Sequence, residues 1–181
     1  FLFNTLNNLY GLSLTEHEKI PGLLLKLSEL LRYSVYNTHE LYVSLRDEID
    51  YLNNYIAFEK IRLGERLKLS CNIETIENKS LKIAPMLLIV FVENAFKHAK
   101  NTQDEEIFID ISLKIWENSV LFSVKNSHFK SSPNTELVED NSGFGLLSVR
   151  KRLALLYPKA HHLNISETPR EYLVKLMLEL K

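Results

Sequence analysis

Residues 83–99 read Ile-Ala-Pro-Met-Leu-Leu-Ile-Val-Phe-Val-Glu-Asn-Ala-Phe-Lys-His-Ala, almost wholly apolar as far as Glu93 and mixed from there on. On a helix with Glu93 at zero, Lys97 lies at about 40°, Asn94 at about 100° and His98 at about 140°. Ionisable side chains are rarely buried unless they are paired or functional, so these four polar groups on one arc indicate a pocket for a charged ligand. The alternative is an amphipathic helix that leaves the core at its C-terminal end, where a cation suits the helix dipole.

The composition excludes several classes of protein. The chain has 181 residues, of which 45% are hydrophobic and 25% charged, as in ordinary globular chains. Its net charge of -1 gives no electrostatic case for nucleic acid or an anionic membrane. The single cysteine, Cys71, excludes an intrachain disulfide and suits a reducing cytoplasmic setting. No run approaches the roughly 18 to 20 apolar residues of a membrane-spanning helix, and the start at Phe1 suggests an excised fragment.

The first third of the chain predicts three helices. Apolar residues recur at three- and four-residue spacings in 2–12, 20–37 and 45–63. Ser44 is a potential N-cap for the third helix, and Gly64 is a potential stop. After Gly64 the pattern changes to the alternation of a half-buried strand, which predicts a domain boundary near residue 64.

The rest of the chain predicts an α+β sandwich, with helices on one face of a mostly antiparallel sheet. The turns 116–119 and 168–171 would each close a hairpin. The predicted elements are a strand at 67–75, a helix at 85–100 with Pro85 in its first turn, strands at 106–116 and 119–126, a helix at 144–157, and strands at 161–168 and 171–179.

A loop of 16 residues is predicted at 127–142. Structureless loops of that length are usually lids, binding loops or disordered segments. This one runs into Ser142-Gly143-Phe144-Gly145-Leu146 at the start of a helix. Glycines at a helix N-terminus let backbone N–H groups hold a phosphate, although Gly143 and Gly145 would serve equally well in a simple turn.

The stretches at 93–99 and 143–146 together resemble the N-box and G2-box of the Bergerat ATP-binding fold, which gyrase, Hsp90, MutL and histidine kinases share. The closest resemblance is to the LytS-type sensor histidine kinases, and it covers essentially the whole chain. The further stretches that carry it are Phe-Leu-Phe-Asn-Thr-Leu-Asn at 1–7, Leu-Leu-Arg-Tyr-Ser at 30–34, Leu-Arg-Asp-Glu-Ile at 45–49, Asn-Tyr at 54–55 and Arg-Lys-Arg-Leu at 150–153.

This resemblance implies a Bergerat-type α/β sandwich preceded by a truncated helical dimerisation hairpin. Residues 1–42 would be the partial dimerisation and phosphoacceptor region, 43–64 a connecting helix, and 65–181 the ATP-binding catalytic domain. In the family, the phosphoaccepting histidine stands immediately before Phe-Leu-Phe-Asn, so the fragment is expected to be unable to autophosphorylate. Simple core packing of the first two helices is the alternative to a dimer seam.

The implied function is that of the cytoplasmic kinase core of a two-component sensor histidine kinase, an ATP-dependent protein histidine kinase. It would bind Mg-ATP and transfer the γ-phosphoryl group to the preceding histidine, for relay to a response regulator. The full-length protein is expected to be a homodimer in the inner or plasma membrane, attached only through segments outside this chain. No nucleic-acid partner is expected.

The family's site residues map onto this sequence one by one. By resemblance, Asn94 would be the magnesium ligand, and Glu93 would polarise the nucleophile or order water near the metal. Lys97 would meet phosphate as a point charge, whereas His98 would contact phosphate or only the helix end. The full expected cofactor-binding set is Asn94, Lys97, His98, Asn126, Gly143, Phe144, Gly145 and Leu146.

The G1-box departs from the family pattern Asp-X-Gly-X-Gly, whose Asp accepts the adenine amino proton. Here Asn126 stands at the Asp position, and Ser127 and His128 follow without a glycine. An amide oxygen can still accept this hydrogen bond, but it gives up charge assistance of roughly 1 kcal/mol. Weaker or slower nucleotide binding is therefore expected.

Two other functions remain open. The altered G1-box suggests a degenerate, non-catalytic kinase that acts as a dimerising scaffold. A relative that hydrolyses ATP as a conformational clamp is disfavoured by the helical stretches at 1–7 and 30–34. Arg150 and Arg152 follow the glycines closely enough that they could reach phosphates or an acidic surface, although for Arg152 a solvated helix face is favoured.

Overall fold

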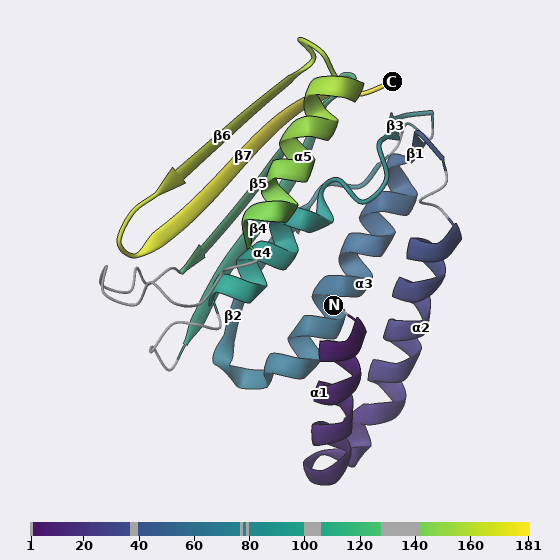
Figure 1. Cartoon of the computed structure of the whole chain (residues 1–181), viewed down its shortest axis with the longest axis vertical. Coiled ribbons are helices and arrows are strands. Elements are labelled where there is room, and N and C mark those ends of the chain that lie inside the picture. Colours follow the sequence, from purple (N-terminus) through teal and green to yellow (C-terminus); the bar gives the residue numbers. More distant parts are fainter. Residues whose placement is uncertain (1, 37–39, 77, 79, 100–105, 128–141) are drawn as a thin grey trace.

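Helices and a five-stranded sheet share one apolar core (Figure 1). The computed structural model describes residues 2–36, 40–76, 78, 80–99, 106–127 and 142–181. The helices are α1 (Leu2–Thr15), α2 (Ile20–Tyr36), α3 (Leu45–Leu63), α4 (Ile89–Ala99) and α5 (Ser142–Leu156). The strands are β1 (Val43–Ser44), β2 (Leu67–Ile73), β3 (Lys82–Ile83), β4 (Ile107–Trp116), β5 (Ser119–Ser127), β6 (His161–Glu167) and β7 (Glu171–Glu179).

The sheet is mixed, with the strand order β2-β4-β5-β7-β6. β2 pairs with β4 in parallel, and the other neighbouring strands pair antiparallel. Trp116 pairs with Ser119 across one hairpin, and the Thr168 N–H donates to the Glu171 carbonyl across the other. Both predicted hairpins are therefore confirmed.

One face of the sheet carries the core, and α4 and α5 lie over that face (Figure 1). α4 packs against β4 and β5, where the rings of Phe91 and Phe122 lie 6.4 Å apart. The alternation predicted for the strands appears as burial of every second residue of β4: Ile107, Ile109, Ile111 and Leu113. The residues between them form the opposite face, on which Phe108 and Trp116 are exposed.

α3 is the central helix of the helical part, and α2 packs against it. Its N-terminus is capped by Ser44, whose Oγ accepts from the Arg46 N–H at 3.1 Å, and it ends before Gly64, which has a φ of 59°. Both predicted helix ends are confirmed. Tyr55 of α3 meets Phe96 of α4 edge-on at 5.9 Å, so α3 joins the first helices to the layer above the sheet.

The start of α4 differs from the prediction. The apolar run favoured a helix from residue 85, but residues 85–88 form turns and α4 begins at Ile89. Met86 has a φ of 56°, which no helical residue adopts. The hydrophobic pattern crosses this boundary without a break, so periodicity could not reveal it.

α5 begins at Ser142 rather than at 144, so Gly143 also belongs to its first turn. The other predicted bounds agree within three residues. The short antiparallel pair of β1 and β3 was missed, since two-residue strands carry no period. The predicted loop at 127–142 lies, apart from its two ends, outside the described residues. The division at residue 64 stays a prediction.

Candidate functional site

Glu93 lies where α4 faces α3. Burial raises the pKa of its carboxyl group, and the negative charge of Glu59 raises it further. Burial also raises the pKa values of Tyr51 and Tyr55, with the charge of Glu93 among the further causes for both. The predicted polar arc therefore begins inside the helical layer, with a carboxyl group that holds its proton more tightly than a solvated glutamic acid.

The other polar residues of α4 differ in their exposure to solvent. Asn94 is partly buried, Lys97 is exposed, and His98 is partly buried. The ring of His98 stacks on that of Tyr172 in β7, with centroids 6.4 Å apart and an interplanar angle of 26°. The C-terminal end of α4 therefore meets the start of β7.

Asn126 is one of the few polar residues in the core, with an exposed fraction of 2%. It pairs with Tyr172 across the sheet, and its Nδ2 donates to the Ser127 carbonyl at 2.8 Å. Because Tyr172 touches His98 and pairs with Asn126, it connects α4 to the end of β5.

Tyr172 was missed by the sequence reasoning, because the alternation of β7 gave it no distinguishing signal. Burial raises the pKa of its hydroxyl; Glu167 raises it as well, and Arg150 of α5 lowers it. The charge of Arg150 therefore acts on the Tyr172 hydroxyl. The structure brings together His98, Asn126 and Arg150 around Tyr172.

The first turn of α5 approaches α4 closely. A Cβ atom placed on Gly145 would lie 3.3 Å from Cγ1 of Val90, which is tighter than an ordinary contact. Leu146 is partly buried and packs on the core. The side chain of Phe144 and the surroundings of Gly143 lie outside the described part of the chain. A side chain at position 145 would require Val90 of α4 to give way by a few tenths of an ångström.

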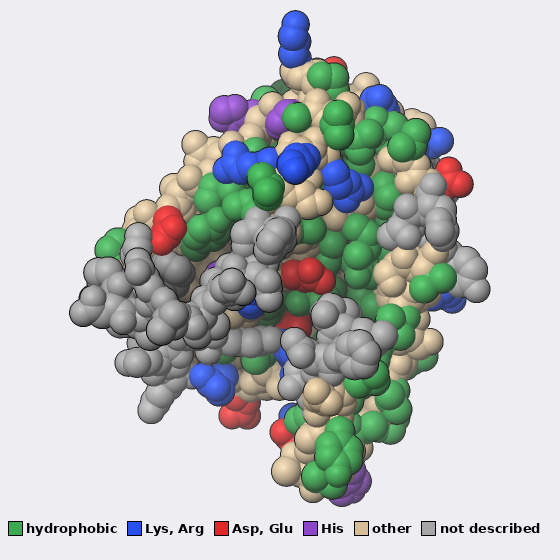
Figure 2. Space-filling model, in the orientation of Figure 1, with side chains coloured by type: hydrophobic (Ala, Val, Ile, Leu, Met, Phe, Trp, Pro, Cys, Tyr) green, Lys and Arg blue, Asp and Glu red, His purple; other side chains and the backbone are tan. Residues whose placement is uncertain are grey.

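Arg152 has a different role from the one that was favoured. The sequence suggested a solvated helix face, but Arg152 is partly buried and its guanidinium group donates to backbone carbonyls before α4. Nη2 donates to the Pro85 oxygen at 2.7 Å, and Nη1 to the Met86 oxygen at 3.4 Å. The solvated reading was wrong, because pattern analysis of one helix cannot detect acceptors in a distant turn. In Figure 2 the basic side chains of α5 gather over this part of the molecule.

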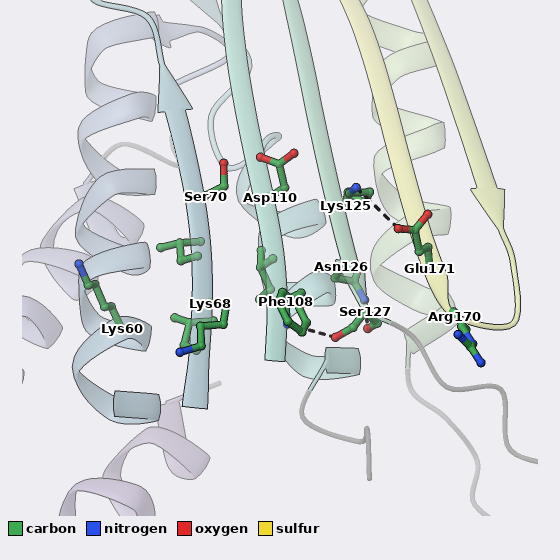
Figure 3. Close-up of a pocket in the computed structure, with 13 residues that line it drawn as sticks. Lys60, Lys68, Ser70, Phe108, Asp110, Lys125, Asn126, Ser127, Arg170 and Glu171 are labelled. Atoms are coloured by element: carbon green, nitrogen blue, oxygen red, sulfur yellow. Dashed lines mark hydrogen bonds and ion pairs between the residues drawn. The ribbon is translucent and has the colours of Figure 1, made fainter. Parts of the chain in front are cut away.

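A cavity of about 1110 Å³ lies across β2, β4 and β5 and is lined mainly by side chains on the face away from α4 (Figure 3). Lys125 and Glu171 form an ion pair there at 3.6 Å, and Ser127 Oγ accepts from the Phe108 N–H at 3.3 Å. Asn126 contributes to its wall, but of the described residues none from α4 does. This cavity is distinct from the pocket predicted on α4.

Comparisons with known proteins agree with the motifs. The histidine kinase family model matches residues 1–67. The chain is 29% identical to the sensor protein LytS of Bacillus subtilis over 174 residues, which cover 92% of this chain and 29% of LytS. The chain thus spans less than a third of the length of this curated relative.

Solved structures share the fold at low sequence identity. The histidine kinase domain of the blue-light activated kinase EL346 from Erythrobacter litoralis has a TM-score of 0.56 at 11% identity, covering 90% of this chain and 75% of that one. Full-length ShkA, solved in complex with AMPPNP, has a TM-score of 0.52 at 14% identity, covering 88% and 35%.

These likenesses, together with a mixed sheet covered on one face by helices, confirm the predicted Bergerat-type fold. In the described part of the chain, no helix has the length and apolar content needed to cross a membrane. The family model and the LytS relative confirm the predicted resemblance of this chain to the LytS-type sensor histidine kinases.

Proposed function

We propose that the chain is the Mg-ATP-binding kinase core of a two-component sensor histidine kinase, an ATP-dependent protein histidine kinase. The observation that carries this proposal is the close approach of α5 to α4 at Gly145, beside the helix that presents Glu93 and Asn94. ShkA, which shares the fold, was solved with AMPPNP, and this supports ATP as the nucleotide.

The proposed metal ligand is Asn94. The residue is partly buried, and its amide oxygen suits Mg²⁺, which prefers oxygen ligands and keeps several waters and phosphate oxygens. Within the described ranges, no group of three or more His, Cys, Asp or Glu side chains offers an alternative protein cage. When bound, the ion would neutralise charge on the β- and γ-phosphates.

The other α4 residues act on the phosphates and on the proton. Lys97 supplies a point charge for phosphate, and His98, held against Tyr172, contacts phosphate or completes the helix end. Glu93, whose pKa is raised by burial, takes up the proton as the acceptor imidazole attacks the γ-phosphorus, the bond to the bridging oxygen breaks and ADP leaves.

Asn126 is the proposed adenine contact. Its Oδ1, the acceptor atom of the amide, would accept the adenine amino proton, while its Nδ2 donates to the Ser127 carbonyl. The first turn of α5, with Gly143, Phe144, Gly145 and Leu146, would supply backbone N–H groups for the phosphates. The described part of the turn supports this role through the close approach of Gly145 to Val90 on α4, the helix that carries Asn94.

The helical part supports a homodimer in the full-length protein. Leu6, Tyr10 and Leu14 recur every four residues along α1 and are exposed by 46%, 69% and 70%. Figure 2 shows apolar side chains gathered where α1 and α2 lie in the view. An apolar stripe of this kind fits a seam between two helical hairpins. We propose residues 1–42 as this hairpin, 43–64 as the connecting helix and 65–181 as the catalytic domain.

The remaining proposals concern the longer protein. A response regulator would receive the phosphoryl group, and the membrane would be reached only through segments outside this chain. The kinase core would lie on the cytoplasmic side. The second candidate function is a non-catalytic scaffold, which the Asn126 departure favours because it removes charge assistance at the adenine.

The test is phosphorylation of a longer protein that includes the residues before Phe1, where the proposed phosphoaccepting histidine would stand. Incubation with Mg-ATP labelled in the γ-phosphate should place acid-labile label on the protein. Asn94→Ala in the same protein should abolish labelling, whereas Asn53→Ala, an exposed amide on α3, should not. Absence of label in the unmodified longer protein, despite nucleotide binding, would favour the scaffold.

A further inference from the structure

The turn that precedes α4 is held from two sides. Residues 85–88 are outside regular structure, and Met86 has the positive φ of 56° that an L-residue rarely adopts. From α5, Arg152 donates to the Pro85 carbonyl at 2.7 Å. The Tyr157 hydroxyl just beyond α5 accepts from the Ala84 N–H at 2.7 Å. These contacts fix the beginning of the turn.

The other side is held by Glu48 of α3, whose exposed fraction is 1%. Its Oε1 accepts from the N–H groups of Leu87 and Leu88 at 2.9 and 3.1 Å. Its Oε2 accepts from the Met86 N–H at 2.8 Å. The carboxylate therefore satisfies three consecutive N–H groups directly before the first residue of α4, as a capping side chain does, although it comes from another helix.

The fourth donor to Glu48 comes from α2. The Tyr33 hydroxyl donates to Oε2 at 2.7 Å. Two acceptor sites on each oxygen are thereby used, so the position of the carboxylate depends on all four donors. The ring of Tyr33 also stacks on Tyr51 of α3, with centroids 4.5 Å apart and an interplanar angle of 23°.

A continuous path of contacts therefore joins α2 to the helix that carries Glu93 and Asn94. It runs from the Tyr33 hydroxyl to Glu48, and from Glu48 to the turn before Ile89. A displacement of α2 that withdraws the hydroxyl leaves Glu48 with a free acceptor site and shifts the cap. Glu93 lies one helical turn after the start of α4, so a shift of the cap acts directly on the turn that leads to Glu93.

We propose that Tyr33 and Glu48 are positioning residues, through which the placement of α2 sets the start of α4 and hence the affinity of the site for Mg-ATP. This inference rests on the proposed function, since it names how the same site is regulated. By reciprocity, Mg-ATP bound at α4 strengthens the contact between Tyr33 and Glu48.

The test compares Tyr33→Phe with Tyr42→Phe in this chain, with Mg-ATP affinity measured by isothermal titration calorimetry. Both variants lose one hydroxyl and keep the ring, but the Tyr42 hydroxyl donates to the Leu156 carbonyl at 3.2 Å and does not touch Glu48. Tyr33→Phe should weaken binding about fivefold or more, within the usual range of coupling between sites. Tyr42→Phe should leave the affinity within about twofold.

A double-mutant cycle separates positioning from general destabilisation. If Tyr33 acts through Glu48, Tyr33→Phe in a Glu48→Ala background, which offers the hydroxyl no acceptor at position 48, should change the affinity no further. Additive effects of the two substitutions, or equal effects of Tyr33→Phe and Tyr42→Phe, would overturn the inference. If the wild-type chain binds no Mg-ATP, the proposed function fails and the inference fails with it. Binding by the wild type that Tyr33→Phe leaves unchanged refutes the inference alone.

A second measurement needs no variant. Amide hydrogen exchange at Leu87 and Leu88 in the wild-type chain should slow when Mg-ATP is added, because nucleotide and cap stabilise each other. Exchange at Ser112, on the far side of the sheet, serves as the control. Unchanged exchange at Leu87 and Leu88 under saturating Mg-ATP would contradict the coupling.

Discussion

Replacing Glu48 by alanine should be among the most damaging single changes in the chain. The substitution removes the acceptor for three backbone N–H groups and for the Tyr33 hydroxyl, all of them within 3.1 Å of the carboxylate oxygens. Each buried donor left without a partner costs about 1–3 kcal/mol. The simple sum, about 4–12 kcal/mol, is an upper bound, because water can enter the space that the side chain leaves.

The substitution also removes an unfavourable contribution of Glu48 to the free energy of folding. Burial raises the pKa of Glu48, so the ionised carboxylate pays a desolvation penalty that alanine removes. Breaking a buried charged network usually costs about 3–5 kcal/mol net, which we expect for Glu48→Ala. At about 2–4 °C per kcal/mol for a chain of this size, the melting temperature should fall by about 6–20 °C.

The assay is urea unfolding followed by circular dichroism at 222 nm, at pH 7. Asp50→Ala is the control, because Asp50 lies on the same helix with an exposed side chain and should change the free energy of unfolding by no more than about 0.5 kcal/mol. Glu48→Gln should fall between the two, since its amide oxygen keeps an acceptor for part of the turn. A loss below about 1 kcal/mol for Glu48→Ala would refute the reasoning that this carboxylate caps α4.

Three further predictions concern the site. Burial raises the folded-state pKa of Glu93, so the stability that Glu93 contributes is present below the unfolded pKa and is lost as pH rises through the folded-state pKa. In urea unfolding, Glu93→Gln should therefore be more stable relative to the wild type at pH 8 than at pH 5. Parallel pH profiles of the two proteins would contradict this. Gly145→Leu should cost about 1–3 kcal/mol by overpacking against Val90, and Val90→Ala should restore part of it; a neutral Gly145→Leu would argue against close helix contact. Asn126→Asp should tighten Mg-ATP binding by roughly 1 kcal/mol through charge assistance while destabilising the free chain, because a carboxylate replaces the donor to the Ser127 carbonyl; an unchanged calorimetric affinity would remove Asn126 from the adenine site.

Elements whose signals are local could be predicted from the sequence. α3 matches its prediction at both ends because Ser44 supplies the cap and Gly64 adopts the positive φ that stops the helix. The hairpin between β4 and β5 was predictable because a short polar turn separates two alternating strands. Local backbone chemistry decides these features, so a single sequence contains the information.

Features that depend on distant partners could not be predicted. Nothing near Pro85 indicates that Glu48, far away in the chain, caps the following turn, and the apolar pattern therefore favoured a helix that starts too early. Arg152 was misread for the same reason, since its acceptors lie in that turn. The parallel pairing of β2 with β4 also depends on tertiary packing.

The residues of the candidate site also divide into those that the sequence could predict and those that it could not. The helical period placed Glu93, Asn94, Lys97 and His98 together, and all four lie on α4. Tyr172 was missed because its importance comes from contacts with His98 and Asn126, which belong to two other elements. Periodicity identifies residues that share one element, whereas a site that spans elements needs the fold.

The most direct test of the central claim is calorimetric titration of this chain with ATP, with and without Mg²⁺. We predict binding that depends on Mg²⁺ in the wild type and that weakens about tenfold, or about 1.4 kcal/mol, in Asn94→Ala. Asn53→Ala, which changes an exposed amide of α3, should bind as the wild type does. An absence of binding heat in the wild type, or a magnesium dependence that survives Asn94→Ala, would contradict the account.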